Sequence, residues 1–425
     1  PELTMPGPTA DERPAAASDT PVRMTSQERR ATFALASLYG LRMFGLFIIL
    51  PVFALYAETL PGGSNHALVG LALGSYGLTQ ALLQIPFGWA SDRWGRKRVI
   101  VIGLVFFAAG SIVAALAHDI SWIIAGRILQ GMGAISAAVI ALAADLTRDS
   151  VRTRTMAAIG MTIGLTFALS IVAAPVLDAL VGVPGIFALT AVLAAGAIWV
   201  VIREVPDAPR RALAATPDAQ RFSSVLRDPV LMRLNFGVFA LHASLMSVFV
   251  QFPLSLKSAG LAPAAHWVVY LPVMVVSFLL VVPLFARADR RRASGAVTAF
   301  ALGCLVIGQA AMAWLPLATS WSLALALLLY FAGLNVLEAV LPAAVSRQAP
   351  ADMRGVATGI YSSLQFLGAF VGAAMGGYLS QLFGPAAAYW FGLGLTLAWA
   401  VFAATQTRAL YNGDTRTKET PAWPR

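Results

Sequence analysis

Gly88 to Arg98 read GWASDRWGRKR, and this stretch places five charged side chains directly between two of the most apolar segments of the chain. Of the 425 residues, 58% are hydrophobic and only 12% are charged. An ordinary soluble domain carries about twice that charged share. The composition therefore indicates a protein embedded in a lipid bilayer, and the charged stretch marks a loop at the membrane surface.

Apolar windows extend along the chain on both sides of this loop. Each is about 20 residues long, the length that an α-helix needs to cross a hydrocarbon core of roughly 30 Å. They predict an all-α membrane protein with twelve transmembrane helices. The predicted spans are 33–57, 67–90, 99–117, 121–144, 155–180, 184–202, 232–256, 267–286, 294–314, 320–344, 355–381 and 386–408.

The basic residues decide the topology. The net charge of +10 would also suit a nucleic-acid partner, but the arginines gather in alternate loops, and the remaining loops hold one basic residue, Lys257. Loops rich in Lys and Arg face the cytoplasm. The pattern predicts that both termini are cytoplasmic, and it gives no reason to expect nucleic-acid binding.

The longest internal loop, Arg203 to Pro229, divides the spans into two sets of six. A trace of a repeat is visible, because FARADRRR (285–292) follows the eighth span as the opening stretch follows the second. Topology alone explains this second loop equally well. The predicted organisation is a disordered cytoplasmic tail at 1–30, an N-terminal six-helix bundle at 31–203, a linker at 204–230, a C-terminal six-helix bundle at 231–410 and a cytoplasmic tail at 411–425.

The pattern Gly88-x-x-x-Asp92-Arg93-x-Gly95-Arg96-Lys97 resembles the loop between the second and third helices of the major facilitator superfamily. In the fourth span, GRILQGMGAISAAV resembles a stretch typical of drug and proton antiporters of that family. The resemblance implies two six-helix halves that work by alternating access. It also implies a bacterial cytoplasmic (inner) membrane location, a monomer, and a small-molecule solute and protons as partners.

The resemblance further implies a conformational latch on the cytoplasmic side. In the family, the loop carboxylate lies near the positive N-terminal end of the eleventh helix, and Arg96 would reach Asp145 at the end of the fourth span. A plain solvated turn is the alternative. The latch residues are Gly88, Asp92, Arg93, Gly95, Arg96, Lys97 and Asp145.

Ionisable side chains inside a bilayer are costly and are functional candidates by default. Five are predicted to couple protons to transport, and Glu338 is the preferred carrier. Arg42 either contacts the solute or pairs with Glu338, and His242 either shares the proton or bonds a neighbouring helix. The other two could form a salt bridge with each other. The five are Arg42, Arg127, Asp178, His242 and Glu338.

Polar and aromatic side chains at matching depths are predicted to line a solute cavity, although buried glutamines also join helices. The candidates are Arg42, Tyr39, Phe47, Tyr76, Gln80, Gln84, Gln130, Asn235, His242, Gln251, Asn335, Glu338, Tyr361 and Gln365. Glycines spaced by four residues predict close helix packing. They are Gly70 and Gly74, Gly160 and Gly164, and Gly368, Gly372 and Gly376.

The preferred function is a proton-coupled exporter of small, lipophilic molecules. The fifth span departs from the antiporter pattern, with Ala174 before Pro175 and with Asp178 in place of a small residue. This departure favours the alternative, a proton symporter or facilitator that imports a metabolite. A membrane-embedded enzyme or receptor is a third reading, but the sequence has no nucleotide-binding, metalloprotease or nucleophile motif. We expect no enzyme activity, cofactor or metal, and the only cysteine is Cys304.

Overall fold

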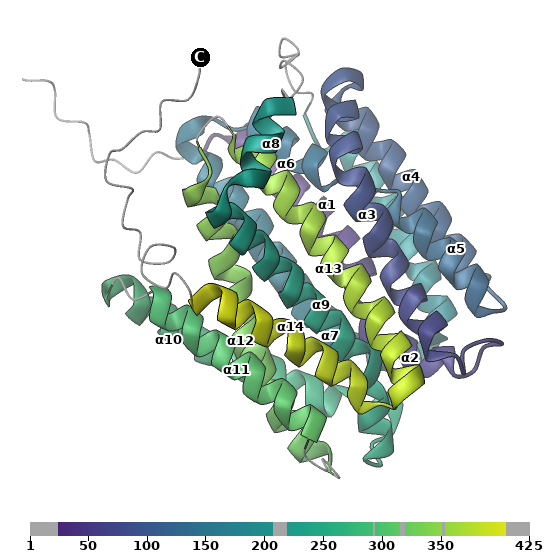
Figure 1. The fold of residues 1–425 in the computed structure, drawn as a ribbon. Coiled ribbons are helices and arrows are strands. Elements are labelled where there is room, and N and C mark those ends of the chain that lie inside the picture. Colours follow the sequence, from purple (N-terminus) through teal and green to yellow (C-terminus); the bar gives the residue numbers. More distant parts are fainter. Residues whose placement is uncertain (1–23, 207–218, 292–293, 315–318, 351–352, 405–425) are drawn as a thin grey trace, which may run out of the picture.

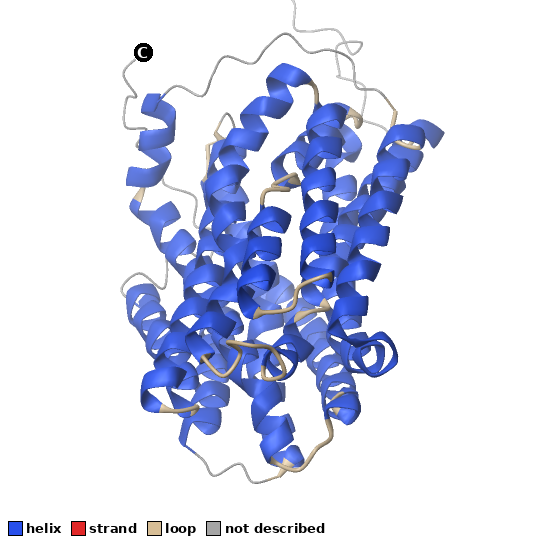
Figure 2. Ribbon diagram, turned by 90° about the vertical axis from the view of Figure 1, so that its right-hand side faces the viewer, coloured by secondary structure: helices blue, strands red, loops and turns tan. Residues whose placement is uncertain are grey.

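The computed structural model describes residues 24–206, 219–291, 294–314, 319–350 and 353–404, and every regular element within these ranges is a helix (Figures 1 and 2). Most of the predicted terminal tails lies outside the described residues. The helices run roughly alongside one another, as Figure 2 shows. The prediction of an all-α membrane protein is confirmed.

Seven helices form the N-terminal half. The first span combines α1 and α2, the fourth combines α5 and α6, and α7 contains the fifth and sixth spans on either side of a turn at Gly182, where φ is 69°. Their bounds are α1 Ser26–Phe47, α2 Leu50–Ala57, α3 His66–Trp94, α4 Arg96–Ala115, α5 Ile120–Gly131, α6 Ser136–Asp145 and α7 Asp149–Arg203.

The C-terminal half begins after a short helix, α8, that lies within the predicted linker. Eleven helices of the described residues are long and apolar enough to cross a membrane, and α7 supplies two crossings, so the twelve predicted spans are present. The bounds are α8 Ala219–Arg227, α9 Pro229–Ser258, the 3-10 turn Pro263–Ala265, α10 Trp267–Arg291, α11 Ser294–Trp314, α12 Ser320–Gln348, α13 Arg354–Phe383 and α14 Ala386–Ala404.

Side-chain caps define where several helices begin. The Thr25 hydroxyl accepts from the Glu28 amide while the Glu28 carboxylate accepts from the Thr25 amide, a capping box that starts α1 within the range predicted as tail. Asn65, Asp119 and Asp228 cap α3, α5 and α9 in the same manner. Polar residues at the membrane surfaces thus set the ends of the apolar helices.

The fourth span is broken in the middle of the membrane. Between α5 and α6, residues 132–135 leave the helix, and Gly133 packs so closely on α4 that an added Cβ would lie 2.5 Å from the Gly103 carbonyl oxygen. Backbone outside a helix is tolerated at this depth only where other groups satisfy it. The break therefore presents carbonyl groups to neighbouring side chains.

The two halves meet along α3 and α13, which lie side by side (Figure 1). A Cβ on Gly70 would lie 2.2 Å from the Ala373 carbonyl oxygen, and one on Gly74 would lie 2.9 Å from that of Phe370. Of the other predicted glycines, Gly368, Gly372 and Gly376 pack on α9 within the C-terminal half. The remaining pair, Gly160 and Gly164, has open space around it.

The apolar core is shared between the halves on the outer side. One cluster joins the outer parts of α1, α2, α3 and α7 to the C-terminal half, while a second contains the inner parts of the N-terminal helices. Lys257 and Glu58, in the outer loops of opposite halves, form an ion pair with 2.5 Å between Nζ and Oε2. The structure is thus closed toward the outside.

We predict that Gly70→Val opens this outer contact, because the added side chain meets backbone that cannot yield. The measurement is the distance distribution between spin labels on Thr59→Cys and Ser258→Cys, in a Cys304→Ser background. We expect a shift to longer distances. Gly160→Val adds the same volume where a Cβ meets no atom within 4 Å and should leave the distances unchanged. Equal distributions for both variants would contradict the prediction.

Candidate functional site

The centre of the N-terminal half contains a buried arginine on α1. The Arg42 side chain donates through Nη1 to Ser136 Oγ at 3.0 Å, and through Nη2 to Tyr76 Oη at 2.8 Å and to the Gly133 carbonyl at 3.2 Å. Only 1% of Arg42 is exposed. Gly133 belongs to the break in the fourth span and Ser136 is the first residue of α6, so the break and the helix end beside it supply acceptors to the guanidinium group.

A second buried arginine lies on the other side of Tyr76. Arg127 donates through Nη1 to Gln130 Oε1 at 2.9 Å, and its guanidinium carbon is 5.0 Å from the centre of the Tyr76 ring. Gln130 in turn donates to Ser111 Oγ at 2.7 Å. Gln80 donates to the Gly131 carbonyl at 3.0 Å. One polar network therefore joins α1, α3, α4 and the fourth span.

The polar cluster of the C-terminal half contains a histidine and a carboxylate. His242 Nε2, on α9, is 3.1 Å from Glu338 Oε1 on α12 and 2.7 Å from Gln365 Nε2 on α13. Its Nδ1 atom is 3.1 Å from the Val238 carbonyl oxygen. A turn before Glu338, Asn335 donates to Ser277 Oγ at 3.0 Å.

The contacts of His242 indicate which of its ring nitrogens carries a hydrogen. A carbonyl oxygen only accepts, so His242 Nδ1 carries a hydrogen toward Val238. Nε2 can then accept from the Gln365 amide, and it also lies 3.1 Å from the Glu338 oxygen. The Glu338 side chain is 36% exposed against 12% for His242. Glu338 is thus the member of the pair that solvent reaches more readily.

The two clusters approach each other through consecutive residues of α13. Gln365 bonds His242, and the next residue, Phe366, packs its ring edge-on against Tyr76 with 6.2 Å between ring centres. Tyr76 bonds Arg42 in the opposite half. The predicted residues Arg42, His242 and Glu338 therefore belong to neighbouring networks, and in this conformation Glu338 pairs with His242 while Arg42 is bonded within its own half.

Aromatic side chains close the space outside these clusters. Phe167 of α7 lies 6.0 Å from Phe331 of α12 and 5.0 Å from Phe47, and Phe331 lies 6.4 Å from Phe249, between ring centres. Phe331 precedes Glu338 by seven residues on the same helix, which is about 10 Å toward the outside. Of this group, only Phe47 is among the predicted lining residues.

Several other predicted residues lie apart from these contacts. Asp178 is half-buried near the outer end of the fifth span, and the described residues contain no ion pair between it and Arg127. Tyr39 is packed in the inner core of the N-terminal half. Four more predicted residues are also buried, namely Gln84, Asn235, Gln251 and Tyr361.

The loop of the predicted latch forms a compact ion network. Arg96 pairs with Asp92 one turn earlier, its Nε is 3.2 Å from Asp145 Oδ2, and its Nη1 donates to Ser91 Oγ at 2.8 Å. Lys97 donates to the Val205 carbonyl at 2.9 Å, and Arg93 stacks on Trp89. The pair between Arg96 and Asp145 is present, whereas Asp92 pairs with Arg96 of its own half. The latch function remains a prediction.

The remaining latch residues are the two glycines. Gly95 separates α3 from α4 with φ at 96°, a conformation that favours glycine over residues with a Cβ. Gly88 faces α6, where a Cβ would meet only Ala137 at 3.5 Å. Gly95 is therefore needed for the sharp turn itself, whereas a Cβ at Gly88 would make only an ordinary van der Waals contact.

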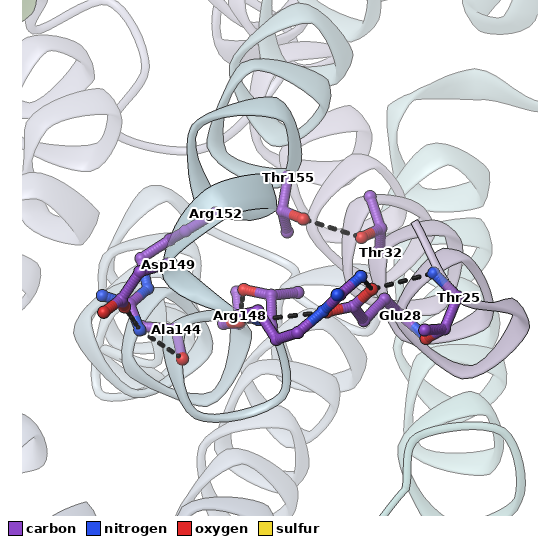
Figure 3. Close-up of polar contacts among 10 residues, drawn as sticks. Thr25, Glu28, Thr32, Ala144, Arg148, Asp149, Arg152 and Thr155 are labelled. Atoms are coloured by element: carbon purple, nitrogen blue, oxygen red, sulfur yellow. Dashed lines mark hydrogen bonds and ion pairs between the residues drawn. The ribbon is translucent and has the colours of Figure 1, made fainter. Parts of the chain in front are cut away.

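A second cytoplasmic ion pair was not foreseen from the sequence (Figure 3). Arg148 donates through Nε to Glu28 Oε1 at 2.8 Å and through Nη2 to Oε2 at 2.9 Å. These bonds raise the pKa of Arg148 and keep the pair ionised. Arg152 holds the Ala144 carbonyl at 3.2 Å, beside Asp145. The sequence signal for Glu28 was its capping-box spacing from Thr25, which does not identify a partner 120 residues away.

Comparison with known proteins gives the family. The model of the Major Facilitator Superfamily matches residues 35–373. The chain is 42% identical to the inner membrane transport protein YajR of Escherichia coli K12, over 92% of this chain and 86% of that protein. It is 25% identical to multidrug resistance protein D of the same organism, over 79% of this chain and 85% of that protein.

A solved structure gives the same result for the fold. The human organic anion transporter MFSD10 superposes with a TM-score of 0.67 at 20% identity, covering 89% of this chain and all of that chain. The family match covers most of the chain, and the described helices have the predicted two-half arrangement. This chain therefore belongs to the major facilitator superfamily and is a multi-pass transporter of the inner membrane, not an enzyme.

Proposed function

We propose that this transporter is a proton-coupled exporter of small, lipophilic molecules and that Glu338 carries the coupling proton. The observation that carries the proposal is the contact of 3.1 Å between Glu338 and His242, two side chains that can each take up a proton. A carboxyl group and an imidazole hydrogen-bonded at membrane depth form a site that can load and release a proton. Gln365 holds the imidazole in place.

Alternating access requires that the same site face each side in turn. The halves share an apolar core on the outer side, and the aromatic group around Phe331 lies between the pair and the outside. In this conformation, which is closed toward the outside, the Glu338 side chain is more exposed than that of His242. These features support an inward-facing stage in which the proton is exchanged with the cytoplasm.

Export is favoured over import by the lining and by one relative. Aromatic side chains such as Phe47, Phe167 and Phe331 suit an apolar solute body. A relative with 25% identity is named a multidrug resistance protein. The second candidate, proton-coupled or passive import of a metabolite, is favoured by the altered fifth span. There, Asp178 stands half-buried where the antiporter pattern has a small residue.

We predict that Glu338→Gln abolishes uphill transport and leaves downhill exchange in place. Glutamine preserves the size and hydrogen bonding of the side chain but cannot carry the proton. One charge that crosses 100 mV releases about 2.3 kcal/mol, enough for roughly a fifty-fold solute gradient. The measurement is solute accumulation in inverted vesicles under an imposed proton gradient, at matched protein abundance. We expect accumulation to fall to the equilibrated level.

Asp178→Asn is the matched control, because it also removes one membrane carboxylate but lies away from the His242 pair. It should accumulate solute as the wild type does. If Glu338→Gln accumulates normally and Asp178→Asn does not, the proton carrier is Asp178. Solute that only equilibrates across the membrane in the wild type, despite the imposed proton gradient, would favour the facilitation alternative.

We also propose that the network around Arg96 is a conformational latch, and we predict that Arg96→Glu impairs transport. The change places three carboxylates together where Asp92 and Asp145 now share one guanidinium group. Asp145→Arg in the same chain restores one ion pair and should recover part of the activity. Asp92→Asn alone should insert normally and reduce the transport rate.

The measurement for the latch is initial transport rate normalised to folded protein in the membrane. Arg98→Glu is the control, because it reverses a nearby exposed charge that lies outside this network. If Arg96→Glu transports at the same rate as Arg98→Glu, the loop has no latch function and is a solvated turn. If adding Asp145→Arg does not raise the transport rate of Arg96→Glu, the pair between residues 96 and 145 plays no part in transport.

A further inference from the structure

The two arginines at membrane depth in the N-terminal half carry permanent charges without a carboxylate partner. Arg42 and Arg127 are 1% and 2% exposed. Their hydrogen-bond partners are hydroxyl, amide and backbone carbonyl oxygens, and no described carboxylate lies within ion-pair distance of either. A charge at this depth is costly unless it is paired. The N-terminal half thus carries two unneutralised positive charges.

Four acidic residues in the described part of the chain have other partners. Glu338, which would be the nearest candidate in depth, is engaged by His242. Glu28 and Asp145 are engaged at the cytoplasmic surface by Arg148 and Arg96. The exposed carboxylate of Glu58 pairs with Lys257 at the outer surface. In this conformation the protein therefore holds its carboxylates away from Arg42.

The groups around Arg42 are able to donate to an anion. Ser136 and Tyr76 accept from Arg42, but both are hydroxyl groups whose hydrogens can turn toward a negative ligand. Arg42 Nε is buried and has no acceptor among the described residues. A guanidinium edge flanked by two hydroxyl donors has the chemistry that recognises a carboxylate.

This group of donors lies at the contact between the halves. The Tyr76 ring packs against Phe366 of the opposite half, so the ring loses this neighbour when the halves separate. Phe47, on the same helix as Arg42, begins the aromatic group that continues through Phe167 to Phe331. An anionic group at Arg42 would thus leave an apolar body against these aromatic rings.

We propose that the transported solute is an amphipathic organic anion and that Arg42, with the Ser136 and Tyr76 hydroxyls, binds its charged group. The inference rests on the proposed exporter function and specifies its substrate class. The charge also suits export, because an anion leaving and a proton entering both move positive charge inward. Each charge contributes roughly fifty-fold to the gradient that 100 mV can sustain.

The test compares ligand charge on constant apolar bodies. Three bodies, naphthyl, biphenyl and decyl, are each used as the carboxylate, the neutral amide and the amine. Binding to the purified full chain is measured by isothermal titration calorimetry at pH 7, without any gradient. We expect at least one body to bind about tenfold more tightly or better as the carboxylate than as the amide, with the amine weakest.

Variants assign this preference to Arg42. Arg42→Gln should remove the preference for the carboxylate over the amide, while Arg42→Lys keeps the charge and should still favour the carboxylate over the amine. Arg29→Gln, which removes an exposed arginine from the same helix, should bind as the wild type does. Matched thermal unfolding checks that each variant is folded.

The outcomes separate this inference from the proposed function. The inference is overturned if none of the three apolar bodies binds more tightly as the carboxylate than as the amide. This outcome includes the case in which no carboxylate binds. An unchanged preference in Arg42→Gln overturns it too, as does tighter binding of the amines. Loss of proton-driven accumulation with an intact carboxylate preference would contradict the exporter proposal and leave the anion site standing. Proton-driven accumulation of amines alone would support the exporter proposal and contradict the anion site.

Discussion

A charged side chain in the bilayer interior must find hydrogen-bond partners or an opposite charge, and this requirement organises the middle of the protein. The chain meets it differently in its two halves. In the N-terminal half, a broken helix offers carbonyl groups to Arg42 and Gln80. In the C-terminal half, three helices bring an imidazole, an amide and a carboxyl group together. One half holds buried arginines, and the other holds an imidazole next to a carboxyl group.

The contact between the halves connects these two chemistries. Gln365 and Phe366 are neighbours in α13, and one bonds His242 while the other packs on Tyr76. A movement of α13 relative to α3 therefore disturbs both networks together. The glycines of the α3 contact allow the backbones to touch, so that small shifts there are felt at the level of individual side chains. The polar clusters of the two halves are thereby adjacent in structure.

Much of the fold followed from the sequence because the bilayer imposes a strong and local rule. Apolar length gave the twelve spans, and Arg placement gave the topology. The division into a linker and two bundles with defined limits remains a prediction. The break in the fourth span was not foreseen, because Met132 to Ile135 are apolar or small and do not interrupt the hydropathy pattern.

The candidate site could be predicted less completely from the sequence, because the contacts of a side chain depend on how its helix is rotated about its own axis. Equal depths suggested that Arg42, His242 and Glu338 share a cavity, yet depth does not say which faces meet. The structure pairs Glu338 with His242 and leaves Arg42 in its own half. The Glu28 and Arg148 pair was missed for the same reason, since neither residue stands out in its own segment.

The order in which the chain is synthesised matters for the broken fourth span. Its open carbonyls and Arg127 bond Arg42, Leu73, Tyr76 and Gln80, and its Gln130 bonds Ser111, all of which emerge from the ribosome earlier. This span therefore enters the membrane when its partners are already in place. His242 has no such advantage, because Gln365 follows it by 123 residues. During biogenesis α9 must wait, with Nε2 of His242 unpaired, until α12 and α13 arrive.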